Sequence, residues 1–522
     1  NLSNYAEGSY TLRLVVNTNN GRPTEERVTF HIMRTPPEVV EVGLGSLYYG
    51  DQSTIAGEYY TNQPSIMKLF YRKVGESNFN FISLDGFATN NQFVKQYHYG
   101  FIPKDLVLPK TSYEIYFEAE NLAGLKTVVK DSSNGINNFI IETDDIPELT
   151  SFQEMPFKLP NGVLFDEPVS FLSDNKNEVL FETYYPSSNF IFSNYKLEND
   201  SFVRYEVDSL FNRFPKFYGD FNNNGLKDLF VANGADVSVE QTTQNSFSFT
   251  KKDSTKDLYL SLLVDDLRND GNHYMITENF PDKKPSRYLL WKIDSDLTTT
   301  FKDTIYVSHT DLNGSHYTSE QIAIDDIDFD GNKELWFLDS GANLNSYVVN
   351  TNLTFTRSDS FYTQGLALTD YSDNLRFGNY DGTGNKDIAI LYRTNSIAPT
   401  FLLLIITFEN HIPKIITQKV FLDQADEYRG GLSSTDFYTS LKFVDIDNDS
   451  LDELVLNMFP YTYILKYSDN KDKIIFYKES SNTESVFVGD LNQNGVPEIA
   501  LNLNEQFKFF EFSSSNRTLI PS

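Results

Sequence analysis

Residues 326–337 read DIDFDGNKELWF, and four further stretches of the chain repeat this pattern. Each opens a nine-residue polar loop with oxygen-bearing side chains at positions 1, 3 and 5 and an acid at position 9, and an apolar run follows. The five copies begin at Asp220, Asp326, Asn379, Asp445 and Asp490. A pattern that returns along the chain indicates an architecture built from one recurring unit.

Two weaker copies extend the series. DLRNDGNHYMIT begins at Asp266 and fits the frame, but Arg268 stands at position 3 and Tyr274 at position 9. SDNKNEVLF, around Asp174, keeps only the acidic stretch and the apolar ending. The six clear copies start about 54 residues apart on average, so residues 151–522 hold about seven such units.

The sequence between the loops predicts β-structure. The chain has 43 Phe and 32 Tyr, and aromatic residues favour strands. Apolar runs bounded by turns are typical of strands buried on both faces, as in four-stranded blades packed around a central axis. We therefore predict an all-β protein in which residues 150–522 form a seven-bladed β-propeller. An array of β-sandwiches is the alternative.

Composition limits the possible partners. A chain of 522 residues is long enough for two or three domains, and its net charge of −30 argues against nucleic acid and anionic membrane surfaces as partners. No apolar run approaches the roughly 18 residues of a membrane span, so we expect no membrane insertion. The absence of cysteine excludes disulfides and thiolate chemistry. The chain begins at Asn1 without a basic and apolar leader, which we interpret as a mature product or a fragment.

Residues 1–35 have the pattern of a β-hairpin. GSYTLRLVV and EERVTFHI alternate apolar and polar positions on either side of the turn NTNNGRP. Two strands cannot close a core, so we interpret the segment as the C-terminal strands of a truncated immunoglobulin-like domain. A hairpin docked on the next domain is the alternative.

A second β-domain is predicted for residues 36–145, between a stiff TPP break at 35–37 and an acidic linker at 144–148. The stretch LPKTSY at 108–113 and the alternating strand after it resemble the E–F corner and F strand of a fibronectin type III domain. Tyr113 would be the corner tyrosine, which buries its ring and bonds its hydroxyl to an upstream backbone carbonyl. The resemblance implies a spacer or a binding module.

The recurring loops present the ligands that calcium prefers. Ca²⁺ takes six to eight oxygen ligands, and alternate residues of a tight loop, joined by the carbonyl of position 7, can turn their oxygens towards one ion. Position 6 is Gly225, Gly331, Gly384 or Gly495 in four copies, which suits a left-handed turn, and Ser450 replaces glycine in the Asp445 copy. An EF-hand is excluded because it needs Glu at position 12, where all five loops have an apolar strand residue.

The repeats resemble the FG-GAP (VCBS) repeats of the integrin alpha-subunit β-propeller and its bacterial relatives. In that family a D-x-D-x-D-G-x-x-D loop joins the first two strands of a blade and holds calcium. The resemblance covers residues 150–522 and implies about five structural Ca²⁺ sites. The ligands implied position by position are Asp220, Asn222, Asn224 and Asp228; Asp326, Asp328, Asp330 and Glu334; Asn379, Asp381, Thr383 and Asp387; Asp445, Asp447, Asp449 and Glu453; and Asp490, Asn492, Asn494 and Glu498.

The loops are not expected to bind calcium with equal affinity. In the Asp266 loop, Arg268 would place its guanidinium at the ion position and pair with Asp266 and Asp270, so we expect no metal there. The Asp174 copy lacks the acid at position 1, so we expect no metal ion there either. The Asp326 and Asp445 loops carry four carboxylates each, so we expect them to bind calcium most tightly. Five ions would change the net charge from −30 to about −20.

No pattern points to catalysis. The six histidines form no metal-ligand pair, and no nucleophile elbow, phosphate loop or dinucleotide motif occurs. We predict no enzyme activity in this chain but a calcium-stabilised binding or scaffold region of a large exported or cell-surface protein, with a protein or glycan ligand and a role such as cell adhesion. Abundant extracellular calcium favours this location. An accessory region of a secreted peptidase or polysaccharide-degrading enzyme is the alternative, and lyase or glycan hydrolase activity of the propeller itself is the third possibility.

Overall fold

The computed structural model describes residues 4–513 except 18–22, 50–51, 85–94, 132–137, 145–151, 161–162, 165–177, 185–189, 207–213, 234–235, 243–248, 256–259, 280–285, 308–321, 328–329, 339–342, 363–373, 384–385, 394–399, 410–411, 423–438, 459, 481–485 and 504–505. The prediction of an all-β protein is confirmed, since the one helical element of the described residues is a short 3₁₀ turn, η1 (Lys104–Leu106). No described helix is long and apolar enough to cross a membrane.

The chain divides into two compact units. The first comprises Asn1–Ile146 with Ser396–Ala398 and Val420–Leu422. The second comprises Pro147–Asn395, Pro399–Lys419 and Asp423–Ser522. The domain identities expected from the sequence stay predictions.

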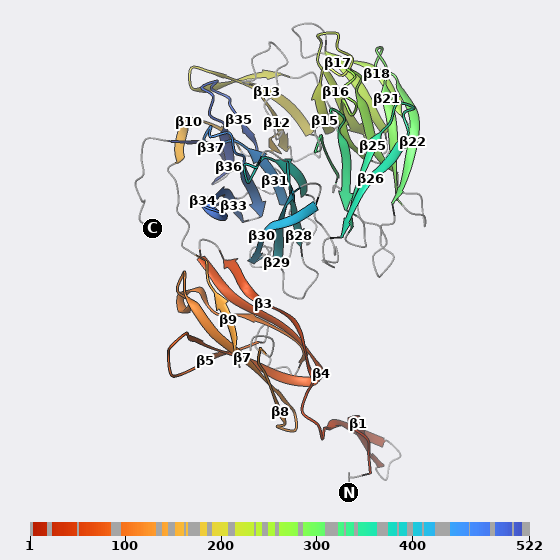
Figure 1. The fold of residues 1–522 in the computed structure, drawn as a ribbon. Coiled ribbons are helices and arrows are strands. Elements are labelled where there is room, and N and C mark those ends of the chain that lie inside the picture. The colour runs from red at the N-terminus through yellow and green to blue at the C-terminus, as the bar shows by residue number, and fades with distance from the viewer. Residues whose placement is uncertain are drawn as a thin grey trace. The chain divides into compact units, whose positions relative to one another are not determined.

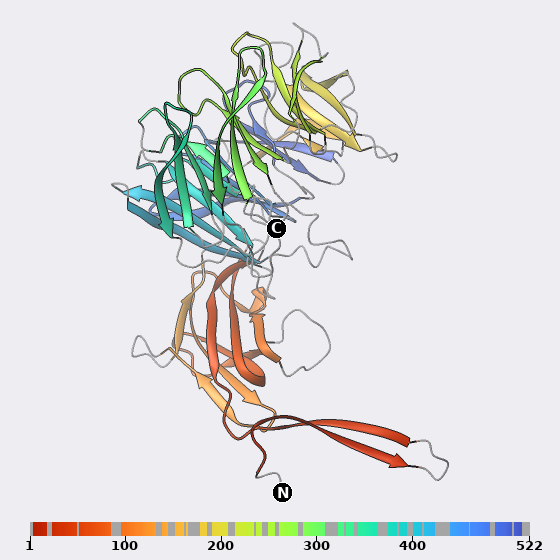
Figure 2. The same cartoon turned by 90° about the vertical axis from the view of Figure 1, so that its right-hand side faces the viewer.

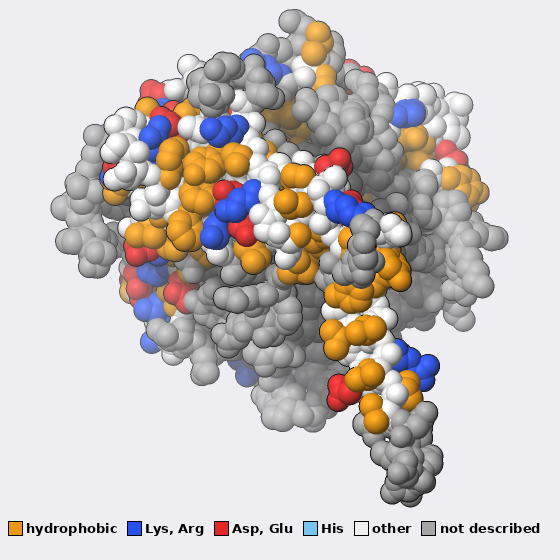
Figure 3. Space-filling view, turned by 90° about the horizontal axis from the view of Figure 1, so that it is seen from below, with side chains coloured by type: hydrophobic (Ala, Val, Ile, Leu, Met, Phe, Trp, Pro, Cys, Tyr) orange, Lys and Arg blue, Asp and Glu red, His pale blue; other side chains and the backbone are white. Residues whose placement is uncertain are grey.

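The first unit begins with a two-stranded sheet. In it β1 (Gly8–Asn17) pairs antiparallel with β2 (Pro23–Ile32), and Figure 2 shows the pair as an extended ribbon. Leu12, Leu14 and Val28 are each more than half exposed, and Figure 3 shows hydrophobic side chains along this hairpin. Two strands cannot shield their own apolar side chains. The interpretation of the hairpin as part of an immunoglobulin-like domain stays a prediction.

The rest of the first unit is organised around the long strand β4 (Gln52–Lys73). The first half of β4 pairs with β3 (Val39–Tyr49) and β6 (Lys95–Phe101), and its second half pairs with β5 (Asn80–Ser83) and β7 (Ser112–Asn121). Strand β7 also pairs with β8 (Lys126–Val129) and β9 (Phe139–Glu142). One long strand therefore takes part in two sets of pairings.

Strand β7 carries the residues that resemble a fibronectin type III strand. Its residues alternate between buried and half-buried, and Tyr113, Ile115 and Phe117 share a core with Ile55. The hydroxyl of Tyr113 accepts a hydrogen bond of 2.8 Å from the backbone N–H of Leu108. The predicted corner bond to the upstream backbone is present, but its partner is an N–H instead of the expected carbonyl. The family assignment stays a prediction.

Within the described residues the second unit contains seven groups of four strands, and the strands of each group are hydrogen-bonded in an unbroken order. In six of them the strands follow chain order: β11 (Val163–Leu164), β12 (Glu178–Tyr184), β13 (Phe190–Glu198), β14 (Ser201–Glu206); β15 (Phe214–Gly219), β16 (Asp228–Asn233), β17 (Asp236–Thr242), β18 (Phe249–Thr255); β19 (Leu260–Asp265), β20 (Tyr274–Asn279), β21 (Ser286–Ile293), β22 (Thr299–Val307); β23 (Ile322–Asp325), β24 (Glu334–Leu338), β25 (Asn343–Val349), β26 (Phe355–Tyr362); β27 (Asn374–Gly378), β28 (Asp387–Arg393), β29 (Thr400–Glu409), β30 (Ile412–Leu422); β31 (Thr439–Val444), β32 (Glu453–Met458), β33 (Tyr461–Ser468), β34 (Lys471–Glu479).

The seventh group joins the two ends of the second unit. It consists of β35 (Val488–Gly489), β36 (Glu498–Asn502), β37 (Gln506–Phe512) and, at its edge, β10 (Phe152–Pro160). Strand β10 pairs antiparallel with β37. Phe157 of β10 and Phe509 of β37 share a core with Val179 of β12 and Leu197 of β13. The last group therefore packs on the first.

Neighbouring groups along the chain also share cores. Phe230 of β16 packs with Met275 of β20, and Val455 of β32 packs with Ile499 of β36. The β19–β22 and β23–β26 groups meet in the same way. Several four-stranded sheets share cores with their neighbours along the chain and the last packs on the first, so the second unit is propeller-like (Figure 1).

Candidate metal-binding loops

Each predicted loop connects the first strand of a group with the second, as the family resemblance implies. The position 9 acid is the first residue of the second strand: Asp228 begins β16, Glu453 begins β32 and Glu498 begins β36. These three side chains are fully buried. The apolar run after position 9 enters the core of the sheet, and it thereby fixes the carboxylate at the mouth of the loop.

The carboxylate at position 1 shapes the loop. Asp220 accepts hydrogen bonds from the backbone N–H of Asn224 at 3.0 Å and of Gly225 at 2.7 Å. The Asp445 loop repeats both bonds. The φ angle at position 6 is +82° for Gly225 and +73° for Ser450, so the serine adopts the left-handed backbone that the sequence predicted. A non-glycine residue in this region costs roughly 1 kcal/mol.

The carboxylate at position 9 binds the backbone inside the fold. It accepts the N–H of position 2 in all five loops, for example from Phe221 to Asp228 at 2.8 Å and from Ile446 to Glu453 at 2.8 Å. Burial raises the pKa of Asp228 to about 6 and that of Glu453 to about 7. Burial raises both values because it removes water from the charged form, and a nearby cation would compensate for that loss.

Several loop oxygens lack a hydrogen-bond donor. Among the described residues this holds for the buried Oδ1 atoms of Asn222, Asp326, Asn379 and Asp447. All four residues are predicted calcium ligands. Buried polar atoms are normally satisfied, and an oxygen without a donor is suited to a cation. The donor set of carboxylate and amide oxygens therefore fits Ca²⁺.

Among the described residues, three acids of the Asp445 loop lie close together. Ligand oxygens of Asp445, Asp447 and Glu453 all lie within 4.8 Å of one another. The ammonium group of Lys466, on β33, lies among them, with Nζ 2.6 Å from Asp447, 2.6 Å from Asp449 and 2.9 Å from Glu453. This lysine side chain is only 18% exposed. A cation of the chain itself is therefore bound by three of the four predicted ligands.

The Asp490 loop has an additional acid that the repeat pattern does not contain. Glu511, on β37, faces Glu498 across the strand pair. Its Oε2 atom accepts hydrogen bonds from the side-chain amides of Asn492 at 2.8 Å and Asn494 at 2.7 Å. Burial, together with the charges of Glu511 and Asp490, raises the pKa of Glu498 to about 7.

The Asn379 loop departs from the common geometry. The side-chain amide of Asn379 donates to the carbonyl of Ser450 at 3.0 Å, and its backbone N–H donates to Asp452 at 2.7 Å. Asp381 accepts both the N–H and the hydroxyl of Thr383. Position 1 of this loop therefore contacts the next repeat while position 3 turns the chain.

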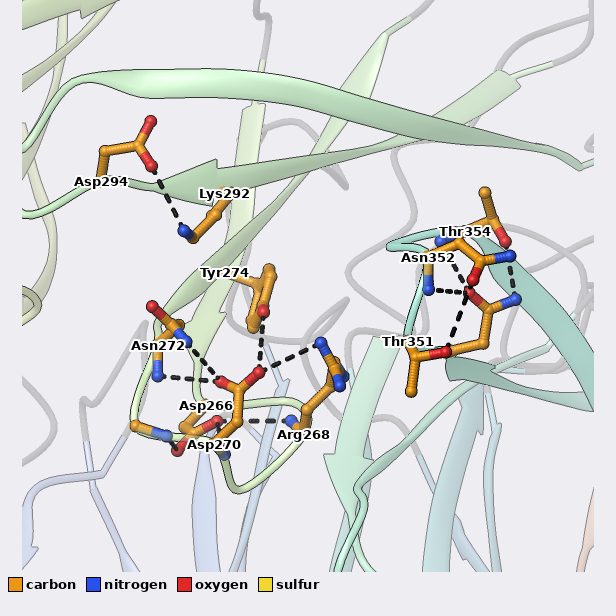
Figure 4. A network of polar contacts seen from close by, with 12 residues as sticks. Asp266, Arg268, Asp270, Asn272, Tyr274, Lys292, Asp294, Thr351, Asn352 and Thr354 are labelled. Atoms are coloured by element: carbon orange, nitrogen blue, oxygen red, sulfur yellow. Dashed lines mark hydrogen bonds and ion pairs between the residues drawn. The ribbon is translucent and has the colours of Figure 1, made fainter.

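The Asp266 loop is closed by its own arginine, as Figure 4 shows. Arg268 lies 3.1 Å from Asp270, and the hydroxyl of Tyr274 donates to the same carboxylate at 3.2 Å. Although burial opposes it, bonds from Asn272 and the Arg268 charge lower the pKa of Asp270. The predicted Arg268–Asp270 pair is confirmed. Asp266 instead accepts backbone N–H groups, including that of Arg268.

Consecutive loops contact one another. Five contacts link the six clear copies in chain order: Asn223 to the carbonyl of Gly271 at 2.7 Å, Lys333 to Asp265 at 2.7 Å, Lys386 to Asp325 at 3.2 Å, Asp452 to Asn379 at 2.7 Å and Asn448 to the carbonyl of Gly495 at 2.8 Å. The six loops therefore form one continuous series on the second unit.

Two residues of the predicted pattern, Asp328 and Gly384, lie outside the described residues. In the Asn379 loop a positive φ of +73° is found at Gly382. The pattern did not find Lys466 and Glu511, because each lies on a different strand from the loop that it contacts. Their only sequence signal is a charge within a largely apolar strand.

Comparison with known proteins assigns no family. No protein-family model and no curated protein matches the chain. Similar solved structures include Saccharomyces cerevisiae Sqt1, with a TM-score of 0.41 and 11% identity over 68% of this chain and 99% of that one. The WD40 domain of Toxoplasma gondii coronin gives 0.42 and 9%, over 72% and 89% of the two chains. The exotype rhamnogalacturonan lyase YesX gives 0.38 and 11%, over 91% and 90%. WD40 repeats form β-propellers. Likeness at this level transfers no activity.

Proposed function

We propose that the second unit is a seven-bladed β-propeller of the FG-GAP type whose loops bind structural calcium ions. The seven groups of four strands and the packing of the last on the first support the closed ring. The continuous series of loop contacts supports a common face for the ion sites. Calcium would fix each hairpin and link neighbouring blades through these contacts.

The observation that carries the calcium proposal is the set of buried oxygens without donors. The oxygens of Asn222, Asp326 and Asn379 lie in loops whose position 9 carboxylates are buried. Satisfying such groups with a cation removes a desolvation penalty of about 1–3 kcal/mol per group. We expect affinities of about 10⁻⁴–10⁻³ M, as in extracellular calcium modules.

Calcium titration of thermal unfolding tests this proposal. With millimolar Ca²⁺ we expect the unfolding midpoint to rise by several degrees over the chelated protein, because ions that bind only the folded state stabilise it. Calorimetric titration should give a stoichiometry above one, and Mg²⁺ should have a smaller effect. An unchanged midpoint with no binding heat would contradict the proposal.

Two matched variants test whether the calcium-induced rise in the unfolding midpoint comes from the Asp326 loop. Asp326→Asn should reduce the calcium-induced rise, since it removes a charged ligand. Asp200→Asn, in the exposed turn between β13 and β14 where φ is +59°, should leave the rise unchanged. Equal responses of the two variants would show that the Asp326 loop does not bind the ion.

We further propose that the chain is a non-catalytic binding or scaffold region of an exported or cell-surface protein. The resemblance to integrin-type repeats supports this role, and the calcium chemistry supports a calcium-rich location. Glycan and protein arrays probed with the calcium-loaded chain should give selective binding. Turnover of a glycan by the chain alone would overturn the non-catalytic proposal.

A further inference from the structure

One position outside the repeat pattern faces the position 9 residue in every group. It lies on the third strand, directly across the antiparallel pair from the start of the second strand. The facing pairs are Glu178 with Lys196, Asp228 with Gln241, Tyr274 with Lys292, Glu334 with Val348 and Glu498 with Glu511. Carried one residue further, the strand registers also pair Asp387 with Thr407 and Glu453 with Lys466. The residue at this facing position is a lysine in some groups, a neutral residue in others and an acid in one.

At Lys466 the facing residue reaches into the loop. Its ammonium group makes contacts of 2.6–2.9 Å with Asp447, Asp449 and Glu453, and so lies among the oxygens that would surround a calcium ion at about 2.3–2.6 Å. An ammonium group and a calcium ion cannot share this space. The lysine supplies one positive charge, and three hydrogen bonds direct it to the acids.

The other two facing lysines occur in the groups whose loops lack the metal ligands. Lys292 stands across from Tyr274, in the loop that Arg268 closes, and it pairs with Asp294 at 3.4 Å (Figure 4). Lys196 stands across from Glu178, in the group that contains the weak Asp174 copy. A lysine at the facing position thus accompanies the loss of metal ligands, and Lys466 is the exception in retaining all four acids.

Glu511 places the opposite charge at the facing position of its loop. It brings a third carboxylate to Asp490 and Glu498, and its Oε2 atom already contacts both predicted asparagine ligands. More carboxylates favour calcium, because the ion prefers charged oxygen ligands.

We propose that the third-strand residue facing position 9 decides whether a loop takes a divalent cation. Lys466 is a built-in cation that makes the Asp445 loop independent of calcium, and Glu511 is an additional ligand of the Asp490 loop. This inference rests on the proposed calcium function. It replaces the expectation, drawn from acid count alone, that the Asp445 loop binds calcium among the tightest.

The test counts calcium ions in the full chain by equilibrium dialysis and calorimetry. Lys466→Met, which keeps the stem and removes the charge, should bind about one more Ca²⁺ than the wild type. The matched control Lys508→Met removes a lysine of β37 that is 30% exposed and paired with Glu154, and it should leave the count unchanged. If the wild type already binds as many ions as Lys466→Met, the inference is overturned.

The same measurement separates the inference from the proposed function. A wild type without calcium and a Lys466→Met variant with one ion would contradict the proposed function and support the inference. A wild type with several ions and a variant with no gain would do the reverse.

A second variant covers the case in which Lys466→Met does not fold. Glu511→Gln should weaken one calcium site about tenfold or more and leave the other sites unchanged, because it removes one charged ligand. Glu154→Gln, on the same sheet, is the control. Equal calcium affinities for Glu511→Gln and the wild type would overturn the role of Glu511.

Discussion

The Asp326 and Asp445 loops have the same four acidic positions and differ in the residue that faces them. Glu334 of the first loop faces Val348, whereas Glu453 of the second faces Lys466, whose Nζ lies 2.9 Å away. The number of acids in a loop therefore does not give the charge that a metal ion would meet. The charge also depends on one residue supplied by a neighbouring strand.

Transplanting the lysine should give the largest effect. Val348→Lys places an ammonium group across from Glu334, and we expect the Asp326 loop to lose its calcium. The calcium-induced rise in the unfolding midpoint should shrink, while the chelated protein keeps or gains stability. Val348→Met adds length without charge and is the control. A full calcium response in Val348→Lys would show that the facing residue does not decide whether the loop binds calcium.

Removing the position 9 acid should separate the two loops. Glu453→Gln takes a charged partner from the largely buried Lys466, so the chelated protein should lose about 1.5–3 kcal/mol of unfolding free energy. Glu334→Gln should cost the chelated protein less and should mainly reduce its response to calcium. Chemical denaturation with and without calcium measures both quantities. Equal losses in the two chelated variants would show that Lys466 contributes no special stabilisation.

Exchanging the residues at position 6 should give a smaller effect. Ser450 has a φ of +73° and Gly331 one of +91°, so both are left-handed. Ser450→Gly should raise the unfolding free energy by about 1 kcal/mol, and Gly331→Ser should lower it by a similar amount. A side chain at Gly331 meets no atom within 4 Å, so the backbone alone sets the cost. Thermal unfolding in chelator measures it, and a loss in Ser450→Gly would contradict the assignment.

The smallest expected effect concerns pH, at an acid outside the repeat pattern. Asp472, on β34, is 10% exposed; it accepts hydrogen bonds from Thr417 and Tyr380 and lies 3.9 Å from Lys419. Burial raises its pKa although Lys419 opposes the shift. The folded state therefore holds the proton more tightly than the unfolded state, so this group's contribution to stability falls as pH rises above about 4.

The variant Asp472→Asn removes this pH-dependent contribution to the unfolding free energy. The difference in unfolding free energy between the variant and the wild type should move in the variant's favour as pH rises from about 4, and level off above the raised pKa. Denaturation at several pH values in chelator measures this difference. A difference that moves towards the wild type would show that the ion pair with Lys419 outweighs burial.

The loop series was predictable from sequence because its signal is local. Position 1, position 9 and the strand entry after it lie within twelve residues of each other, so one frame contains them all. Arg268 could be paired with Asp270 for the same reason. The corner hydroxyl of Tyr113 was also placed correctly, although its backbone partner is a donor.

The facing residue was not predictable in this way. Lys466 and Glu511 follow their position 9 acids by 13 residues, but Lys292 follows Tyr274 by 18 and Thr407 follows Asp387 by 20. The hairpin between the second and third strands varies in length, so no fixed spacing exposes the position. Only strand register places it opposite the loop.

The pairing of β10 with β37 also constrains how the second unit is made. Lys508 and Glu154, which pair across these strands, are 354 residues apart in the chain. Contacts between such distant residues form slowly, because a long loop must close before they contribute stability. During synthesis from the N-terminus, β10 therefore cannot pair with β37 until almost the whole unit has been translated. A chain cut short before β37 would leave both β10 and the neighbouring sheets with exposed edges, open to aggregation.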